Sequence, residues 1–347
     1  GSNPITSTPI KSLAHIMKAF TYVRLCMAVA LYSFLCLYPV SAQSLSGFQP
    51  VAPRHVVFDT DWWTDVDDAC AIRLLLQQER EGRVVVDGIC LSAVRPTSVA
   101  SLSAFLDYEG RPNIPLGVDR EATDFTGKPS YHELIIESHP RRAADNADAY
   151  EDCVVFYRTL LARAADPIDI IAVGYPNALA RLLSSKPDTI SNLSGKELVT
   201  SKVRHLWMMA GKYPSGKENN FTRTARSREA GTLIATSWPT PITFLGWEIG
   251  IQVVAGSHLS NTDLLHRILV AHGSGKGRYA WDPLTVLMAV WGDPHAAGYD
   301  TVRGKLSVDA TTGENVFSPY NEGPHRYVVM RHEPQWYVDY LDALLCR

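Results

Sequence analysis

The chain has 347 residues, of which 46% are hydrophobic and 20% are charged, as is typical of a globular protein that buries a sizeable core. Its formal net charge at pH 7 is −3. Proteins that bind nucleic acid or membrane surfaces need concentrated positive charge, so this balance argues against both classes.

Residues 17–42 have the pattern of a secretory signal peptide. Lys18 and Arg24 precede an apolar run of about 15 residues, and small residues stand before Gln43. The run is shorter than the roughly 20 apolar residues of a transmembrane helix, which favours a removed signal over a retained anchor. We therefore expect a secreted protein without membrane contact after signal removal, divided into an upstream segment (1–16), the signal peptide (17–42), a short linker (43–52) and one domain (53–347).

Strand-like runs alternate with amphipathic, helix-like segments along most of this domain. Strands are predicted at 55–58, 83–91, 114–118, 168–173, 203–209 and 241–246. Helices are predicted at 67–80, 99–110, 149–164, 176–185, 261–273 and 281–292. Such alternation is typical of an α/β fold in which an open, mostly parallel, Rossmann-like sheet has helices on both faces.

The first predicted strand and helix enclose a loop rich in aspartate, within the segment HVVFDTDWWTDVDDACAIRLLL (55–76). Ten residues of this segment contain five carboxylates, those of Asp59, Asp61, Asp65, Asp67 and Asp68. Ligands of open parallel sheets bind at this end of the strands. Carboxylates this close repel one another unless a cation neutralises them, and oxygen ligands without histidine or cysteine favour Ca²⁺ or Mg²⁺.

Three other interpretations of this loop explain less. An EF-hand loop would need glycine in place of Thr64 and glutamate in place of Cys70. A phosphatase-type pair of Asp59 and Asp61 leaves the aspartates of the helix without a role. A polar loop with helix-terminal acids needs fewer than five carboxylates.

The segment VVFDTDWWTDVDDACAI resembles the N-terminal signature of the calcium-dependent, inosine–uridine-preferring nucleoside hydrolases, in the subgroup that reads DTDxGxDxDDA. Further segments that resemble this family, in its order, are YEGRPNIPLGV (108–118), IDIIAVGYPNALARLL (168–183), MMAGKYPSGKENN (208–220), WPTPITFLGWEIG (238–250) and YAWDPLTVL (279–287). The resemblance implies the nucleoside hydrolase fold and a catalytic role for the domain at 53–347. The expected reaction cleaves the N-glycosidic bond of a ribonucleoside to free base and ribose.

The resemblance also implies a Ca²⁺ site. Asp61, Asp68 and Asp282 match its carboxylate ligands, and Val173 matches the ligand that offers a main-chain carbonyl. A bound cation makes water more acidic, so Asp61 also matches the general base that takes the proton. We expect Asp59 to brace the loop without touching the ion.

Three residues match those that hold the ribose hydroxyls in this family, namely Asp67, Glu218 and Asn220. The loop is two residues longer than in the usual family pattern, which makes Asp65 the alternative to Asp67. Asn220 also heads a glycosylation acceptor sequence, as Asn192 does, so a glycoprotein is expected. A pocket residue cannot carry a glycan in an active molecule, and we expect Asn220 in the pocket.

Trp281 stands where many relatives have a histidine that protonates the leaving base. Tryptophan cannot act as an acid but can stack on a nucleobase, so purine nucleosides are expected; a packed core tryptophan is the alternative. Trp62 and Trp63 are expected to wall the pocket or to anchor the loop. The turn after the second strand lacks the family's asparagine, leaving Val94 or Arg95 there. Other polar candidates near loops are His132, His139 and His325.

The main hypothesis is thus a secreted, Ca²⁺-dependent N-ribohydrolase whose partner is a small nucleoside and not a nucleic acid. One alternative keeps the fold but acts on another N-glycoside or ribosylated compound. The other is a catalytically silent protein that binds nucleosides or sugars. A homo-oligomer, dimer or tetramer, is compatible with the sequence.

Four cysteines follow the signal peptide. Cys70 and Cys90 lie in apolar patterns and are expected to be buried thiols. In an oxidising compartment Cys346 could link the C-terminal tail to Cys153.

Overall fold

The computed structural model describes residue 1, residues 52–142 and residues 144–346. The signal peptide, and all but the ends of the upstream segment and the linker, lie at 2–51 outside the described residues, so these assignments stay predictions. Among the described helices, none is long and apolar enough to cross a membrane.

Each predicted strand forms, with ends within two residues of the predicted ones. The described strands are β1 (Arg54–Thr60), β2 (Val84–Leu91), β3 (Leu116–Val118), β4 (Glu151–Asp152), β5 (Ile168–Ala172), β6 (Val203–Met209), β7 (Ser215–Gly216), β8 (Ile242–Leu245), β9 (Val254–Ala255), β10 (Arg278–Tyr279), β11 (Tyr299–Val308), β12 (Asn315–Pro319) and β13 (His325–Met330).

Eleven of these strands form one sheet in the order β4-β3-β2-β1-β5-β6-β8-β13-β11-β12-β7. Pairing is parallel from β4 to β13 and antiparallel from β13 to β7. The antiparallel end was not predicted from the sequence. β9 and β10 form a separate antiparallel pair. The expected open and mostly parallel sheet is therefore confirmed.

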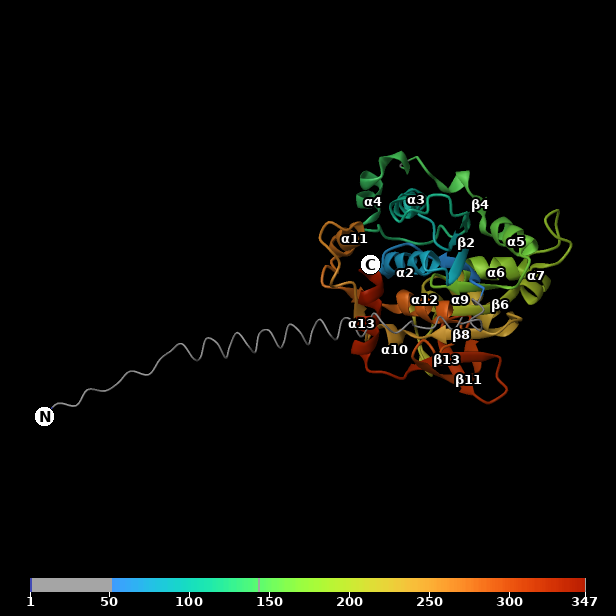
Figure 1. Cartoon of the computed structure of the whole chain (residues 1–347). Helices are drawn as coiled ribbons and strands as arrows, with labels where there is room; N and C mark the ends of the chain where they lie inside the picture. Colours follow the sequence, from blue (N-terminus) through green and yellow to red (C-terminus); the bar gives the residue numbers. More distant parts are fainter. Residues whose placement is uncertain (2–51, 143, 347) are drawn as a thin grey trace, which may run out of the picture. The chain divides into compact units, whose positions relative to one another are not determined.

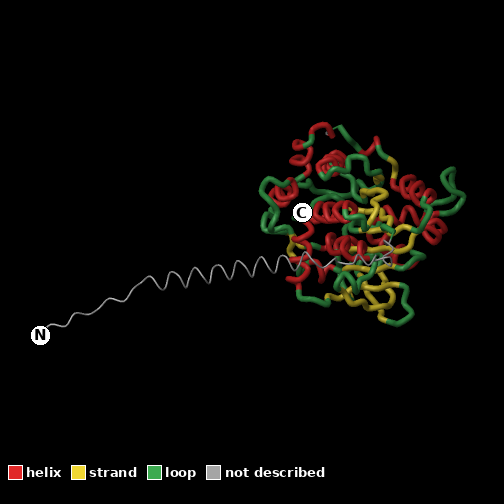
Figure 2. The backbone as a smooth tube through the Cα atoms, viewed as in Figure 1, coloured by secondary structure: helices red, strands yellow, loops and turns green. Residues whose placement is uncertain are grey.

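Helices cover both faces of this sheet (Figures 1 and 2). The described α-helices are α2 (Asp67–Arg80), α3 (Ser98–Tyr108), α4 (His132–Ser138), α5 (Cys153–Arg163), α6 (Asn177–Ser184), α7 (Gly195–Lys202), α8 (Asn219–Thr222), α9 (Ala225–Ser237), α10 (Trp247–Gly250), α11 (Leu264–His272), α12 (Trp281–Trp291) and α13 (Pro334–Leu345). Two short 3₁₀ segments are η1 (Pro140–Arg142) and η2 (Ala147–Ala149).

The side chains of β1 alternate between two hydrophobic cores, one on each face of the sheet. Val56 and Phe58 pack into the core that holds α2, α3, α12 and α13. Val57 packs into the core that holds α5, α6 and α9. A parallel strand buried on both faces needs apolar residues at successive positions, which explains the unbroken run HVVF.

β2 lies on one side of β1 in the sheet, and β5 lies on the other side. This reversal opens a crevice beyond the carboxyl ends of β1 and β5, where open α/β sheets bind ligands. Asp61 follows β1 and Val173 follows β5. The topology alone therefore brings these two residues to one place.

Candidate active site

A cavity of about 230 Å³ lies at the carboxyl ends of β1, β5 and β6. All the residues that the sequence assigns to the ion, the base and the sugar line it: Asp61, Asp67, Asp68, Val173, Glu218, Asn220, Trp281 and Asp282. The remaining lining residues are Asp65, Met209, Asn219 and Trp247. Trp247 lies in the family-like segment at 238–250, but nothing in its spacing marked it as a pocket residue.

The floor of the cavity is a cluster of three buried aspartates. Asp67 and Asp68 open α2, and Asp282 lies in the first turn of α12. One carboxylate oxygen from each lies within 4.8 Å of the other two. Asp67 Oδ2 also accepts a hydrogen bond from the Asp282 backbone N–H at 3.2 Å. Two helix N-termini, whose dipoles favour negative charge, therefore hold this cluster together.

The donor set fits a hard divalent cation. It offers carboxylate oxygens from Asp61 and the three aspartates, and Val173, which carries the expected carbonyl ligand, lines the same cavity. Such donors suit Ca²⁺ or Mg²⁺ better than zinc. The cluster contains Asp67, to which the sequence assigns the ribose, so Asp67 is also placed to hold the ion.

Burial and mutual repulsion raise the pKa of these carboxyl groups. For Asp61, burial and then the neighbouring Asp68 place the pKa well above its ordinary value of 3.8. Asp67 and Asp282 shift the same way, because of burial and then of other aspartates. Burial raises the pKa of Asp68 to about 7 although Thr60 donates a hydrogen bond to it. A cation in the cavity would reverse these shifts by neutralising the carboxylates.

Asp59 lies behind the cavity and does not line it. Its side chain is fully buried and accepts a hydrogen bond from the Tyr157 hydroxyl at 2.6 Å. Its backbone carbonyl accepts a hydrogen bond from the Val173 N–H at 2.8 Å, which ties the end of β1 to the end of β5. The position of Asp59 thus agrees with the bracing role expected for it, and Tyr157 is a partner that sequence reasoning missed.

Asp65 forms an ion pair with Arg278, in the strand that leads into α12. Arg278 Nε donates to Asp65 Oδ1 at 2.8 Å, and its Nη2 donates to Oδ2. Burial alone would raise the pKa of Asp65, but the Arg278 guanidinium lowers it below the usual value. Asp65, the alternative to Asp67 for holding the ribose, therefore has a partner 213 positions further along the chain.

The two tryptophans of the loop anchor it and do not line the cavity. Trp62 is fully buried, and its indole N–H donates to Ser101 Oγ at 2.9 Å. Trp63 is 2% exposed, and its ring packs against Phe125 with the Arg223 guanidinium 4.5 Å from its centroid. Of the two expected roles, the structure supports the anchor.

Glu218 and Asn220 are both buried at the start of α8. Glu218 accepts hydrogen bonds from the backbone N–H groups of Gly211 and Asn220, at 2.9 and 2.8 Å. The Asn220 amide Nδ2 donates to the carbonyls of Val173 and Met209, at 2.8 and 2.9 Å. An asparagine held in this way inside a cavity is not available for glycosylation, whereas Asn192 is exposed.

Trp281 and Trp247 also line the cavity and lie next to each other. The Trp281 indole N–H donates to the Trp247 carbonyl at 2.8 Å, which fixes the ring and uses its only donor. Gly250 makes room for this ring, because a Cβ atom there would lie 2.1 Å from Trp281 Cδ1. Trp281 is thus a partly exposed cavity residue whose ring is fixed by its neighbours, and not a fully buried core residue.

No described histidine lines the cavity. His132 is fully buried, and burial lowers its pKa to about 3. His325 is also buried and accepts a hydrogen bond from the Leu306 backbone N–H at 2.9 Å. Arg95 donates to the Phe125 carbonyl at 2.7 Å and is likewise absent from the lining. These residues have structural contacts and do not supply a leaving-group acid.

The suggested link between Cys153 and Cys346 does not form. Both cysteines are free thiols, as are Cys70 and Cys90. Cys153 packs in the core with α5 and α6, whereas the helix before Cys346, α13, packs in the core on the other face of the sheet. Two residues on opposite faces of a sheet cannot form a disulfide.

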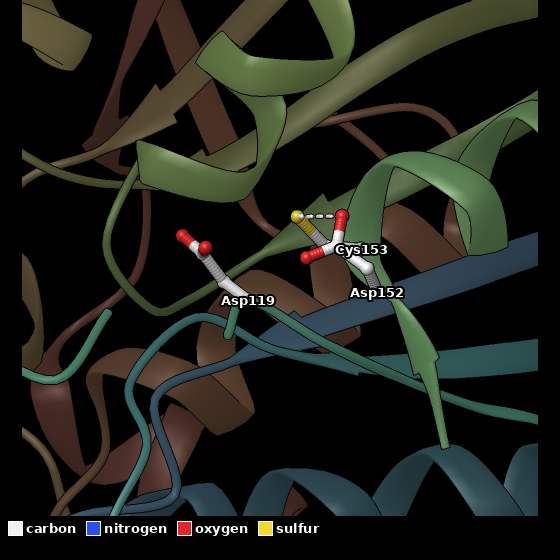
Figure 3. Close-up of side chains that lie close together, drawn as sticks. All are labelled: Asp119, Asp152 and Cys153. Carbon is white, nitrogen blue, oxygen red and sulfur yellow. Dashed lines mark hydrogen bonds between the residues drawn. The ribbon is translucent and has the colours of Figure 1, made fainter. Parts of the chain in front are cut away.

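Cys153 belongs to a second acidic group, with Asp119 and Asp152 (Figure 3). Arg181 Nη1 lies within 2.7 Å of Asp119 Oδ1, 2.9 Å of Asp152 Oδ2 and 3.1 Å of Cys153 Sγ. A guanidinium therefore already contacts all three members of this group, which we interpret as an ion-pair cluster that joins α6 to the ends of β3 and β4.

Solved structures of nucleoside hydrolases are similar to this chain. A plant nucleoside hydrolase, the PpNRh1 enzyme, matches with a TM-score of 0.62 at 20% identity, over 84% of this chain and 99% of its own. The inosine–uridine preferring nucleoside hydrolase from Bacillus anthracis matches with a TM-score of 0.62 at 15% identity, over the same shares.

A third similar structure is the type III effector protein XopQ complexed with adenosine diphosphate ribose. It matches with a TM-score of 0.59 at 14% identity, over 85% of this chain and 94% of its own. No protein-family model and no curated protein matches the chain. At these identities the likeness concerns the fold: the chain has the nucleoside hydrolase fold.

Proposed function

We propose that the protein is a secreted, Ca²⁺-dependent N-ribohydrolase that cleaves ribonucleosides to free base and ribose. The observation that carries the proposal is the cavity itself, which gathers five aspartates, Glu218 and Asn220 at the switch point of the sheet. The fold shared with solved nucleoside hydrolases supports it. Secretion rests on the N-terminal pattern at 17–42.

Asp61, Asp67, Asp68, Asp282 and the Val173 carbonyl would hold the ion. Their oxygen atoms match the preference of Ca²⁺ for hard ligands in flexible geometry. When bound there, the ion would lower the pKa of water next to the ribose and would neutralise the carboxylates.

Asp61 is the residue that takes the proton from the attacking water. It is half-buried and lines the cavity, so its carboxylate can reach a water molecule held there. Its Oδ1 accepts a hydrogen bond from the Trp63 backbone N–H at 3.2 Å, which orients the carboxylate. Asp67, Glu218 and Asn220 hold the ribose hydroxyls.

The two tryptophans bind the leaving base. Trp247 and Trp281 present aromatic surface to the cavity, and the Trp281 N–H is engaged by the Trp247 carbonyl. This end of the cavity therefore offers stacking and no proton donor from tryptophan. Because the larger purine rings gain more from stacking than pyrimidines, purine nucleosides are the preferred substrates.

A ribosylated compound larger than a nucleoside is the second candidate. The similar XopQ structure contains adenosine diphosphate ribose. In this chain Lys212 Nζ lies 4.8 Å from the centroid of the half-exposed Trp247 ring, so a cation stands near the cavity mouth. Such a cation could pair with a phosphate attached to the ribose.

A panel assay separates these candidates. The secreted protein is incubated with purine and pyrimidine nucleosides and with adenosine diphosphate ribose, and free base and reducing sugar are measured. Release of base from nucleosides, lost with chelator and in Asp61→Ala, supports the proposal. Cleavage of the diphosphate compound alone supports the second candidate, and binding of ribosides without any cleavage contradicts both.

A further inference from the structure

The ion pair between Asp65 and Arg278 is the feature of this cavity that the proposed function does not use. Asp65 lines the cavity, whereas Arg278 does not. Asp65 is the aspartate of this cavity that forms an ion pair with a described residue. The other four, Asp61, Asp67, Asp68 and Asp282, form no ion pair within the described part of the chain. One of five neighbouring carboxylates thus has its own counterion.

Arg278 is held firmly on its side of the pair. Its backbone pairs with Ala255 in the two-stranded sheet of β9 and β10. Its guanidinium carbon lies 5.2 Å from the centroid of the Tyr279 ring and 5.4 Å from that of Trp281. The planar guanidinium offers two parallel N–H groups to one carboxylate, so the contact fixes both charge and orientation.

Asp65 is held equally firmly. Its carboxylate accepts a hydrogen bond from the Val66 backbone N–H at 2.7 Å, and its carbonyl accepts one from the Tyr131 hydroxyl at 2.9 Å. The two-residue extension of the loop is therefore fixed at Asp65 from two directions. With Asp65 paired, four aspartates of the cavity instead of five face a cation without an ion pair to a described residue.

We propose that Arg278 is a positioning residue that sets the divalent-cation affinity of the cavity by withdrawing Asp65 from it. This inference rests on the proposed function only in assuming that the cavity binds a cation, and not on the hydrolysis. One unit charge a few ångströms from the ion changes its affinity by about tenfold when the effective dielectric is high. The pair thus keeps a site with many carboxylates from binding its ion too tightly.

The test is calorimetric titration of Ca²⁺ into the full chain without substrate. Arg278→Ala exposes the Asp65 charge and should tighten binding about tenfold, whereas Asp65→Asn leaves Arg278 uncompensated and should weaken it about tenfold. The double variant restores the net charge and should bind within about twofold of the wild type. Arg278→Lys keeps the positive charge but loses the two parallel N–H groups, and its Ca²⁺ affinity should also stay near that of the wild type.

Arg331→Ala serves as the matched control, because it removes a positive charge from an ion pair with the exposed Asp300. Thermal unfolding of each variant shows that it is folded before titration. If Arg278→Ala and Asp65→Asn both weaken binding, the pair is merely structural and the inference is wrong.

The sign pattern separates this inference from the proposed function. If the variants shift affinity in opposite directions but no nucleoside is cleaved, the inference holds and the hydrolase proposal fails. If nucleosides are cleaved and the two single variants shift affinity in the same direction, only the inference fails. A wild type that binds no divalent cation overturns the inference together with the ion site.

Discussion

Trp62 illustrates how a single residue shapes the aspartate-rich loop after β1. Its φ angle of 41° lies in the left-handed region, which costs a bulky residue of the order of 1–3 kcal/mol. The indole ring offsets this cost by full burial against Phe105 and Tyr131, with centroids at 5.4 and 5.7 Å. The packing of the Trp62 ring in the core thus stabilises the backbone conformation next to Asp61.

Trp281 carries the first residue-level prediction. Trp281→Ala removes the stacking surface at the leaving-group end, so kcat/KM for purine nucleosides should fall by about tenfold or more, as expected for the loss of an aromatic stacking contact. Pyrimidine nucleosides should lose less, because their smaller rings stack less. Steady-state kinetics on both classes measures the difference, with Trp291→Ala at the half-exposed end of α12 as a control. Equal losses would show that Trp281 only supports the fold.

At the scale of elements, α2 and α12 pack against each other (Figure 1). Their N-termini meet, since the Asp282 backbone N–H donates to Asp67 Oδ2. Asp67 and Asp68 begin one helix and Asp282 begins the other. Gly250 at the end of α10 lies under the Trp281 ring. The position of the first turn of α12 therefore depends on Gly250 having no side chain.

Gly250→Ala tests this packing. The added Cβ would lie 2.1 Å from Trp281 Cδ1 and 2.7 Å from its backbone Cα, so α12 must shift at the turn that carries Asp282. We expect Ca²⁺ affinity and kcat/KM both to fall by at least tenfold, because a small displacement of a positioned group is costly. Gly275→Ala, which meets mainly the Val270 side chain at 3.1 Å, should leave both unchanged. Full activity in Gly250→Ala would refute the constraint.

The elements around the site could be predicted from the sequence because their signals are local. The run HVVF and the apolar periodicity after Asp68 define β1 and α2 without any distant contact. The partner of Asp65 could not be predicted, because Arg278 meets it only through the fold. The same holds for β11 and β12, whose exposed antiparallel positions lack the unbroken apolar runs of the central strands.

At the scale of the whole molecule, the sheet separates two cores and places the cavity at its carboxyl edge. This separation explains why Cys153 and the C-terminal helix do not meet. It also buries the acids of the site, and burial raises the pKa of both Asp59 and Asp68 to about 7. Stability should therefore depend on both pH and the cation.

A raised carboxyl pKa stabilises the folded protein fully below the unfolded value near 3.8, and this contribution is lost as the pH rises through about 7. The ion-free protein should thus have a lower Tm at about pH 8 than at about pH 5. Added Ca²⁺ should raise the Tm more at the higher pH, where the carboxylates are ionised. Calorimetry in chelator and in Ca²⁺ measures this, and Asp68→Asn should reduce the dependence. An equal Ca²⁺ effect at both values would contradict the account.

The most direct measurement of the central claim is the release of free base from inosine by the chelated protein before and after Ca²⁺ is restored. We predict no release in chelator, release of base and ribose in equal amounts after Ca²⁺ addition, and none in Asp61→Asn at any Ca²⁺ concentration. Release that is unaffected by chelation, or that survives in Asp61→Asn, would contradict it.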